Sequence, residues 1–161
     1  MKKSSNSTNC IFCRIVSGDI PSEIIWDDDS HVAFLTPFPN TEGFTVVATK
    51  EHKPSYAFEN DNETLTSIVL ATKKVARFID KAYADVGRCG MFFEGFGVDH
   101  LHSKLFPMHG TGNMDDWEMI ESDILEVYFD KYPGYLSSHN GKKAEDKELR
   151  KIADKIRKAI K

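Results

Sequence analysis

The chain has 161 residues, of which 40% are hydrophobic and 29% charged, and its formal net charge is −4 at pH 7. This length predicts one domain with a sizeable core, and the composition is typical of a soluble globular protein. No segment approaches the roughly 20 consecutive apolar residues of a membrane span, and residues 1–9 lack the apolar run of a secretory signal. Because three cysteines without such a signal favour a reducing compartment, we expect a cytoplasmic protein with no membrane partner.

Charge is spread unevenly along the chain. Residues 142–161 hold nine Lys or Arg against four Asp or Glu, a net of +5, which leaves −9 for residues 1–141. Nucleic-acid binding needs a broad basic footprint, so the acidic body argues against a nucleic-acid partner. Acidic residues interrupt the basic tail and aromatic residues are absent from it, so we interpret the tail as the solvated face of a helix.

The first half of the chain consists of short apolar segments that turn residues separate. Residues 1–9 are polar and predicted to be disordered, and residues 10–16 are expected to form a short helix. Apolar runs then predict three strands, over residues 23–26, 31–35 and 44–49, of which the last is rich in β-branched residues.

A long helix dominates the second half. Apolar residues at helical spacing predict it from residue 62 or 63 to about residue 84. Two further strands and two helices are predicted after it, over residues 88–94, 98–107, 115–128 and 144–160. Five antiparallel strands with one long helix inserted before the last two predict the α+β fold class.

The last predicted strand carries an unusual row of cationic side chains. With a period of two, His100, His102 and Lys104 lie on one face, and Leu101 and Leu105 lie on the other. The loop before this strand contains two glycines, whose backbone N–H groups can approach a ligand closely. A cationic face beside such a loop is typical of a site for a phosphorylated ligand. The alternative is a pair of surface histidines on an edge strand.

Several motifs resemble the histidine-triad family, in the same order along the chain. They are Cys-Ile-Phe-Cys-Arg-Ile-Val-Ser-Gly-Asp-Ile-Pro-Ser at residues 10–22, Val-Ala-Phe-Leu at 32–35, the segment 43–52, and Val-Asp-His-Leu-His at 98–102. The resemblance implies a five-stranded antiparallel sheet with one long helix, and a homodimer whose two sheets join into one. A histidine-triad domain would then occupy residues 10–110, with residues 111–161 as a helical extension packed on the same domain.

The resemblance also implies chemistry at the α-phosphate of a nucleotide. The family motif is His-φ-His-φ-His, with φ apolar, but here Ser103 takes an apolar position and Lys104 replaces the third histidine. By resemblance, His102 is the nucleophile and His100 orients it through its backbone carbonyl. An imidazole can attack phosphorus, form a phosphoramidate and leave again. Lys104 would supply positive charge near the phosphate, without the proton shuttling of an imidazole.

A nucleotide pocket can be assigned by the same resemblance. The substrate-binding candidates are Ile11, Phe12, Ile15, Phe34, Thr36, Pro37, Gly97 and Val98. The apolar members are equally compatible with a role in the core alone. Thr36 stands where the family usually has a ribose-binding aspartate, while Phe93 and Gly97 replace a usual Asn and a usual Ser or Thr, so we expect fewer ribose and phosphate contacts.

A second group of residues fits a metal ion. Cys10-x-x-Cys13 with His52 and His100 makes a Cys2His2 set, which tetrahedral zinc prefers, and several bacterial members of the family look alike in having such a site. We predict a structural zinc that ties the N-terminal turn to the sheet and takes no part in the chemistry. A reduced, metal-free cysteine pair is the alternative.

Together these features predict a hydrolase that acts on a nucleoside phosphoramidate or on a dinucleoside polyphosphate such as diadenosine tetraphosphate, through a covalent nucleotidyl-histidine. Phosphate in place of water would turn the same intermediate into that of a nucleotidyltransferase or phosphorylase. Outside the enzymes, the alternative is a nucleotide-binding module that has lost turnover together with the third histidine.

Overall fold

The computed structural model describes residues 9–115 and 143–160. Its elements, in chain order, are α1 (Ile11–Val16), β1 (Ile24–Asp27), β2 (His31–Leu35), β3 (Thr45–Thr49), the 3-10 helix η2 (Ala57–Glu59), α2 (Asn62–Ala82), β4 (Val86–Phe92), β5 (His102–His109) and α3 (Asp146–Ile160). The strands form one antiparallel five-stranded sheet in the order β1-β2-β3-β5-β4. The predicted α+β class is therefore confirmed.

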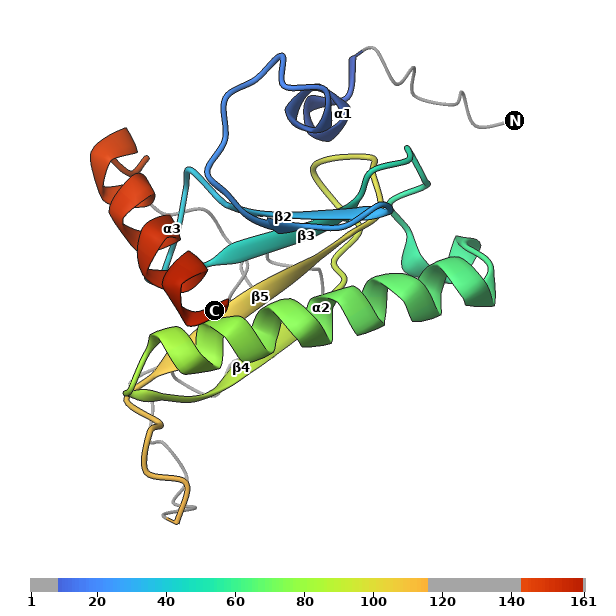
Figure 1. Ribbon diagram of the computed structural model, residues 1–161. Coiled ribbons are helices and arrows are strands. Elements are labelled where there is room, and N and C mark those ends of the chain that lie inside the picture. The colour runs from blue at the N-terminus through green and yellow to red at the C-terminus, as the bar shows by residue number, and fades with distance from the viewer. Residues whose placement is uncertain (1–8, 116–142, 161) are drawn as a thin grey trace, which may run out of the picture.

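Both faces of the sheet are covered, which buries its central strands. Every residue of β2 and β3 is buried. Ala33 pairs with Val47, and both pack toward α2, whereas Phe34 pairs with Val46, and both pack with α1 on the opposite face. Figure 1 shows α1 above one face of the sheet and α2 along the other. Because both faces are apolar, β2 and β3 read as nearly continuous hydrophobic runs.

Helix α2 begins where the sequence predicts it. The Asp61 side chain caps it by accepting a hydrogen bond of 2.7 Å from the backbone N–H of Thr64. Ile68 and Ile79 are fully buried on the face that packs against the sheet. The helix ends at Ala82, slightly before the predicted end.

Removing core volume from α2 should destabilise the fold. Ile79→Ala is expected to lower the free energy of unfolding by about 2–5 kcal/mol, because Ile79 is 0% exposed and its loss leaves a cavity. Leu70, on the outer face of the same helix and 57% exposed, is the matched control, and Leu70→Ala should change stability by less than about 0.5 kcal/mol. Urea denaturation of the two variants measures the difference, and equal effects would contradict this packing.

The start of the last strand differs from the prediction. Strand β5 begins at His102, whereas the sequence pattern placed its start at residue 98. Gly97 has a φ of +86°, and the N–H of His100 donates to the carbonyl of Val98 at 2.9 Å. This tight bend takes residues 98–100 out of the sheet ladder. The boundaries of β1, β3 and β4 differ from the predicted ones by only one or two residues.

The predicted alternation along the last strand is confirmed. Leu101 packs against Ile68 of α2, and Leu105 belongs to the core on the same side of the sheet. His102 and Lys104 line a pocket on the other side. One face of this strand therefore packs in the core, and the other face lines the pocket.

Helix α3 packs against α2 (Figure 1), and it also contacts β1. Leu149, Ala153 and Ile156 join the core cluster that α2 forms with the sheet. The Nε of Arg157 donates to the backbone carbonyl of Ile24 at 2.8 Å, which attaches the helix to the first strand. This helix confirms the one predicted over residues 144–160.

Two other predictions fall outside the described residues: the helix over residues 115–128 almost entirely, and the disordered segment over residues 1–9 except for its last residue. In residues 9–115 and 143–160, no helix is long and apolar enough to cross a membrane.

Candidate functional site

A pocket of about 510 Å³ opens on the α1 side of the sheet. All eight residues predicted to bind substrate line it: Ile11, Phe12, Ile15, Phe34, Thr36, Pro37, Gly97 and Val98. His102 and Lys104, predicted to be catalytic, line the same pocket. The structure thus brings these residues to one place, while their roles stay predictions.

Some residues that line the pocket were not predicted from the sequence. Phe38 and Phe96 come from irregular segments without a periodic pattern, and Asp146 and Arg150 come from α3, far along the chain. No local motif marks them, because only the packing of α3 beside β1 brings its first turns to the pocket.

His102 is the only imidazole in the described lining of the pocket, and it is firmly held. It is 2% exposed, and the Phe12 ring packs against it in a T-shaped arrangement with ring centroids 5.1 Å apart. Its Nδ1 lies 2.7 Å from the backbone carbonyl of His100. Since a carbonyl only accepts, Nδ1 carries the proton and Nε2 carries the lone pair. Burial lowers the pKa of His102, although the hydrogen bond to the carbonyl acts against this.

Lys104 is paired with a carboxylate that the sequence reasoning did not single out. Its Nζ lies 2.6 Å from Oε2 of Glu94, and the two side chains are only 16% and 19% exposed. Lys104 lies opposite Phe92, the last residue of β4, so Glu94 follows two residues beyond the end of the paired strand. An acidic residue just beyond a strand that pairs with the lysine is the signal that could have indicated this pair.

The hydroxyl of Thr36 is partly used within the protein. Thr36 is buried, and its Oγ1 accepts a hydrogen bond of 3.3 Å from the backbone N–H of Phe38. Its own proton remains to be donated, so Thr36 offers a single polar atom to a ligand in this pocket.

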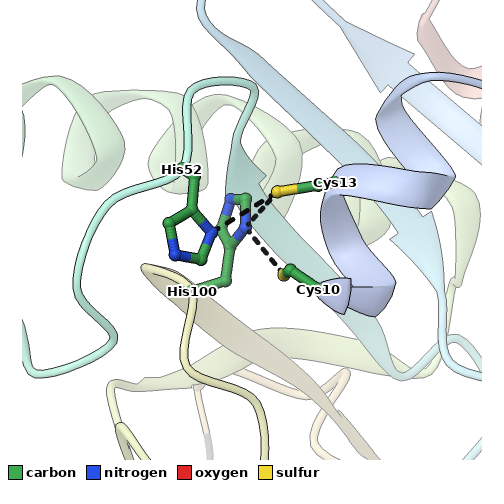
Figure 2. A group of neighbouring side chains, drawn as sticks. All are labelled: Cys10, Cys13, His52 and His100. Atoms are coloured by element: carbon green, nitrogen blue, oxygen red, sulfur yellow. Dashed lines mark hydrogen bonds between the residues drawn. The ribbon is translucent and has the colours of Figure 1, made fainter. Parts of the chain in front are cut away.

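The four predicted metal ligands form one cluster, drawn in Figure 2. The ligand atoms of Cys10, Cys13, His52 and His100 all lie within 4.8 Å of one another. Sγ of Cys10 is 3.3 Å from Nδ1 of His100, and Sγ of Cys13 is 3.4 Å from Nδ1 of His52. A tetrahedral zinc with sulfur and nitrogen ligands at about 2.3 and 2.0 Å places S and N about 3.5 Å apart, so the cluster fits this ion.

A further hydrogen bond orients the imidazole of His100 in this cluster. Its Nε2 donates to the backbone carbonyl of Thr49 at 2.7 Å, which leaves Nδ1 with its lone pair toward the cysteines. Burial, together with Cys10, raises the pKa of the Cys13 thiol to about 11. A bound cation would reverse this preference, because a metal stabilises the thiolate.

Comparison with known proteins identifies the family. The family model described as the HIT domain matches residues 17–111, more than half of the chain. The chain belongs to the HIT family. The segment matched by the HIT domain contains His102, Lys104 and Glu94, and helices α1 and α3 lie outside it.

Three similar proteins give the range of the family. Adenosine 5′-monophosphoramidase hnt1 of Schizosaccharomyces pombe is 34% identical over 100 residues, which are 62% of this chain and 75% of that protein. A crystal structure of a Hit-like protein from Bartonella henselae has a TM-score of 0.68 at 25% identity, covering 97% of this chain and 99% of that chain. A zinc-bound histidine-triad family protein from Mycobacterium smegmatis also has a TM-score of 0.68, at 21% identity, covering 96% of this chain and 95% of that chain. The last comparison supports the fold.

In this protein of the HIT family, α1 connects the cysteine cluster to the pocket. Cys13 lies in the cluster, while its neighbour Phe12 makes T-shaped ring contacts with both His100 and His102, with centroids 5.8 and 5.1 Å apart. A ligand that holds the cysteines in place therefore also holds the pocket residues of α1 in place.

Proposed function

We propose that this protein hydrolyses a nucleotide at its α-phosphate through a covalent intermediate on His102. The observation that carries the proposal is the tautomer of His102. Because Nδ1 donates to the carbonyl of His100, the lone pair of Nε2 is available to a ligand in the pocket that His102 lines. The phosphoramidase activity named for the S. pombe relative supports chemistry of this class.

The proposed reaction has two steps. Nε2 of His102 attacks the α-phosphorus and displaces the leaving group, and water then attacks the phosphoramidate and releases the nucleotide. Lys104 lines the same pocket and supplies positive charge to the phosphate oxygens. His100 acts through its backbone carbonyl, while its side chain lies in the cysteine cluster.

The nucleoside would occupy the apolar part of the pocket. Ile11, Phe12 and Phe34 offer a surface for a flat base, and the Thr36 hydroxyl offers one contact to the ribose. Gly97 and Val98 would lie beside the phosphate, since both line the pocket and belong to the segment between the first glycine of the loop, Gly95, and β5.

We further propose a structural zinc held by Cys10, Cys13, His52 and His100. Four protein ligands complete its tetrahedral shell, so it would order α1 rather than bind substrate. The zinc would cross-link α1 to the sheet.

The proposed assembly follows the family resemblance, and the proposed location follows the cysteine content. A homodimer with a joined sheet would use an edge strand, and β4 is an edge of this sheet. We place the protein in the cytoplasm, with residues 10–110 as the catalytic domain and residues 111–161 as its extension.

Product analysis tests the proposed function. The protein is incubated with adenosine phosphoramidate and with diadenosine tetraphosphate, each with and without added phosphate. AMP as a product of at least one substrate is expected. A product in which added phosphate has joined AMP would instead indicate a phosphorylase, and binding without turnover would indicate a nucleotide-binding module.

A further inference from the structure

The ion pair between Lys104 and Glu94 lies beside the pocket and limits what Lys104 can do for a leaving group. The pair is short, at 2.6 Å, and mostly shielded from water. Lys104 and His102 are two residues apart on β5, so their side chains lie on the same face and both reach the pocket. Glu94 is not part of the described pocket lining, so it supports the lysine rather than the ligand.

This arrangement makes Lys104 a fixed charge. An ammonium has three N–H donors, and the bond to Glu94 uses one and leaves two for phosphate oxygens. If Lys104 gave its proton to a substrate, the Glu94 carboxylate would remain charged, largely buried and without this counter-charge, which is costly. The pair therefore favours charge stabilisation over proton donation.

Leaving groups differ in whether they need a nearby positive charge or a donated proton. When Nε2 of His102 bonds to the α-phosphorus, the bond to the leaving group breaks and the leaving atom keeps its electron pair. A phosphate leaves as a stable anion and needs only positive charge nearby. An amine would leave as an unstable amide anion, so its nitrogen must receive a proton from a general acid. In the second step water bonds to phosphorus, the electron pair returns to Nε2, and one proton is released to solvent.

We propose that Glu94 and Lys104 together select nucleotide substrates whose leaving group departs as a phosphate anion, that is phosphoric anhydrides, over nucleoside phosphoramidates. Lys104 contacts the leaving phosphate, and Glu94 is the positioning residue that directs the ammonium. This inference rests on the proposed hydrolase function and adds the class of bond that is cleaved.

The first test compares two substrates with the intact protein. The kcat/KM for diadenosine tetraphosphate should exceed that for adenosine phosphoramidate by about 100-fold. Lys104→Ala should lower the value for the anhydride by about 100-fold or more, with a much smaller effect on the phosphoramidate. Lys104→His, which restores an imidazole, should shift the preference toward the phosphoramidate by at least about tenfold.

The second test separates positioning by Glu94 from a general structural effect. Glu94→Gln should lower kcat for the anhydride by about tenfold with little change in KM, and it should have no further effect in a Lys104→Ala background. Asp27→Asn removes an ion pair of similar length, 2.7 Å to Lys50, away from the pocket, and should leave both activities unchanged. If Glu94→Gln fails to fold, Glu94→Asp keeps the charge, shortens its reach and gives the same comparison.

The outcomes separate the inference from the function on which it rests. Turnover of neither substrate would overturn the proposed hydrolase and the inference with it. Equal or faster turnover of the phosphoramidate would overturn the inference alone. An equal effect of Glu94→Gln with and without Lys104 would show that Glu94 does not act through the lysine.

Discussion

Replacing His102 with alanine should abolish turnover while leaving the fold intact. His102 is the only imidazole in the described pocket lining, and its tautomer presents a lone pair at Nε2. Without it the covalent step has no nucleophile, so we expect kcat to fall on the order of 10⁴-fold or more. Steady-state kinetics with the better of the two adenosine substrates measures the loss.

Two comparisons make this result specific. His109→Ala removes the imidazole at the other end of β5, which hydrogen-bonds Asp85 rather than facing the pocket, and should leave kcat within about threefold of wild type. Calorimetric titration with AMP should show that His102→Ala still binds nucleotide, because the apolar wall is unchanged. Activity of His102→Ala within about tenfold of wild type would remove His102 as the nucleophile.

The strands were predictable because their sequence signals are local. The run over residues 31–35 matches β2 at both ends, since its residues are all buried between two layers and turn residues bound it. The start of α2 was equally visible, because Asp61 caps the helix and an apolar face follows it.

The start of β5 could not be predicted from alternation. The pattern His100-Leu101-His102 continues the two-residue period backward from the strand, and the side chains do alternate in burial direction. The backbone nevertheless bends at residues 98–100, and this bend brings the carbonyl of His100 to Nδ1 of His102. Side-chain periodicity reports which face a residue occupies, but not whether its backbone joins the ladder.

The residues with distinctive chemistry could be predicted from the sequence, whereas those that surround them could not. The cysteine and histidine types at Cys10, Cys13, His52 and His100 indicate metal chemistry by themselves, and the structure brings all four together. Glu94 and the α3 wall depend on strand register and on the docking of a distant helix, which residue types do not encode.

Loss of one cysteine from the cluster should remove zinc and lower stability. Purified protein is expected to contain about one zinc per chain, and Cys13→Ser should contain almost none, since three remaining ligands leave the tetrahedral shell incomplete. A metal that binds only the folded chain stabilises it by about 4 kcal/mol when free metal is about 1,000 times the dissociation constant. For a chain of this size, losing that contribution lowers Tm by roughly 8–16 °C.

Cys89→Ser is the matched control for this prediction, because Cys89 lies on β4 and outside the cluster. It should keep its zinc, as elemental analysis of both variants would show. Protein prepared without chelator that contains no metal would contradict the zinc site. The loss of zinc should affect activity much less than it affects the metal content. Helix α1 loses its cross-link, but the hydrogen bond from Nδ1 of His102 to the carbonyl of His100 joins two residues only two positions apart and involves no residue of α1. We therefore expect Cys13→Ser to retain kcat within about tenfold of wild type, far above His102→Ala, which would assign the zinc to structure rather than to chemistry.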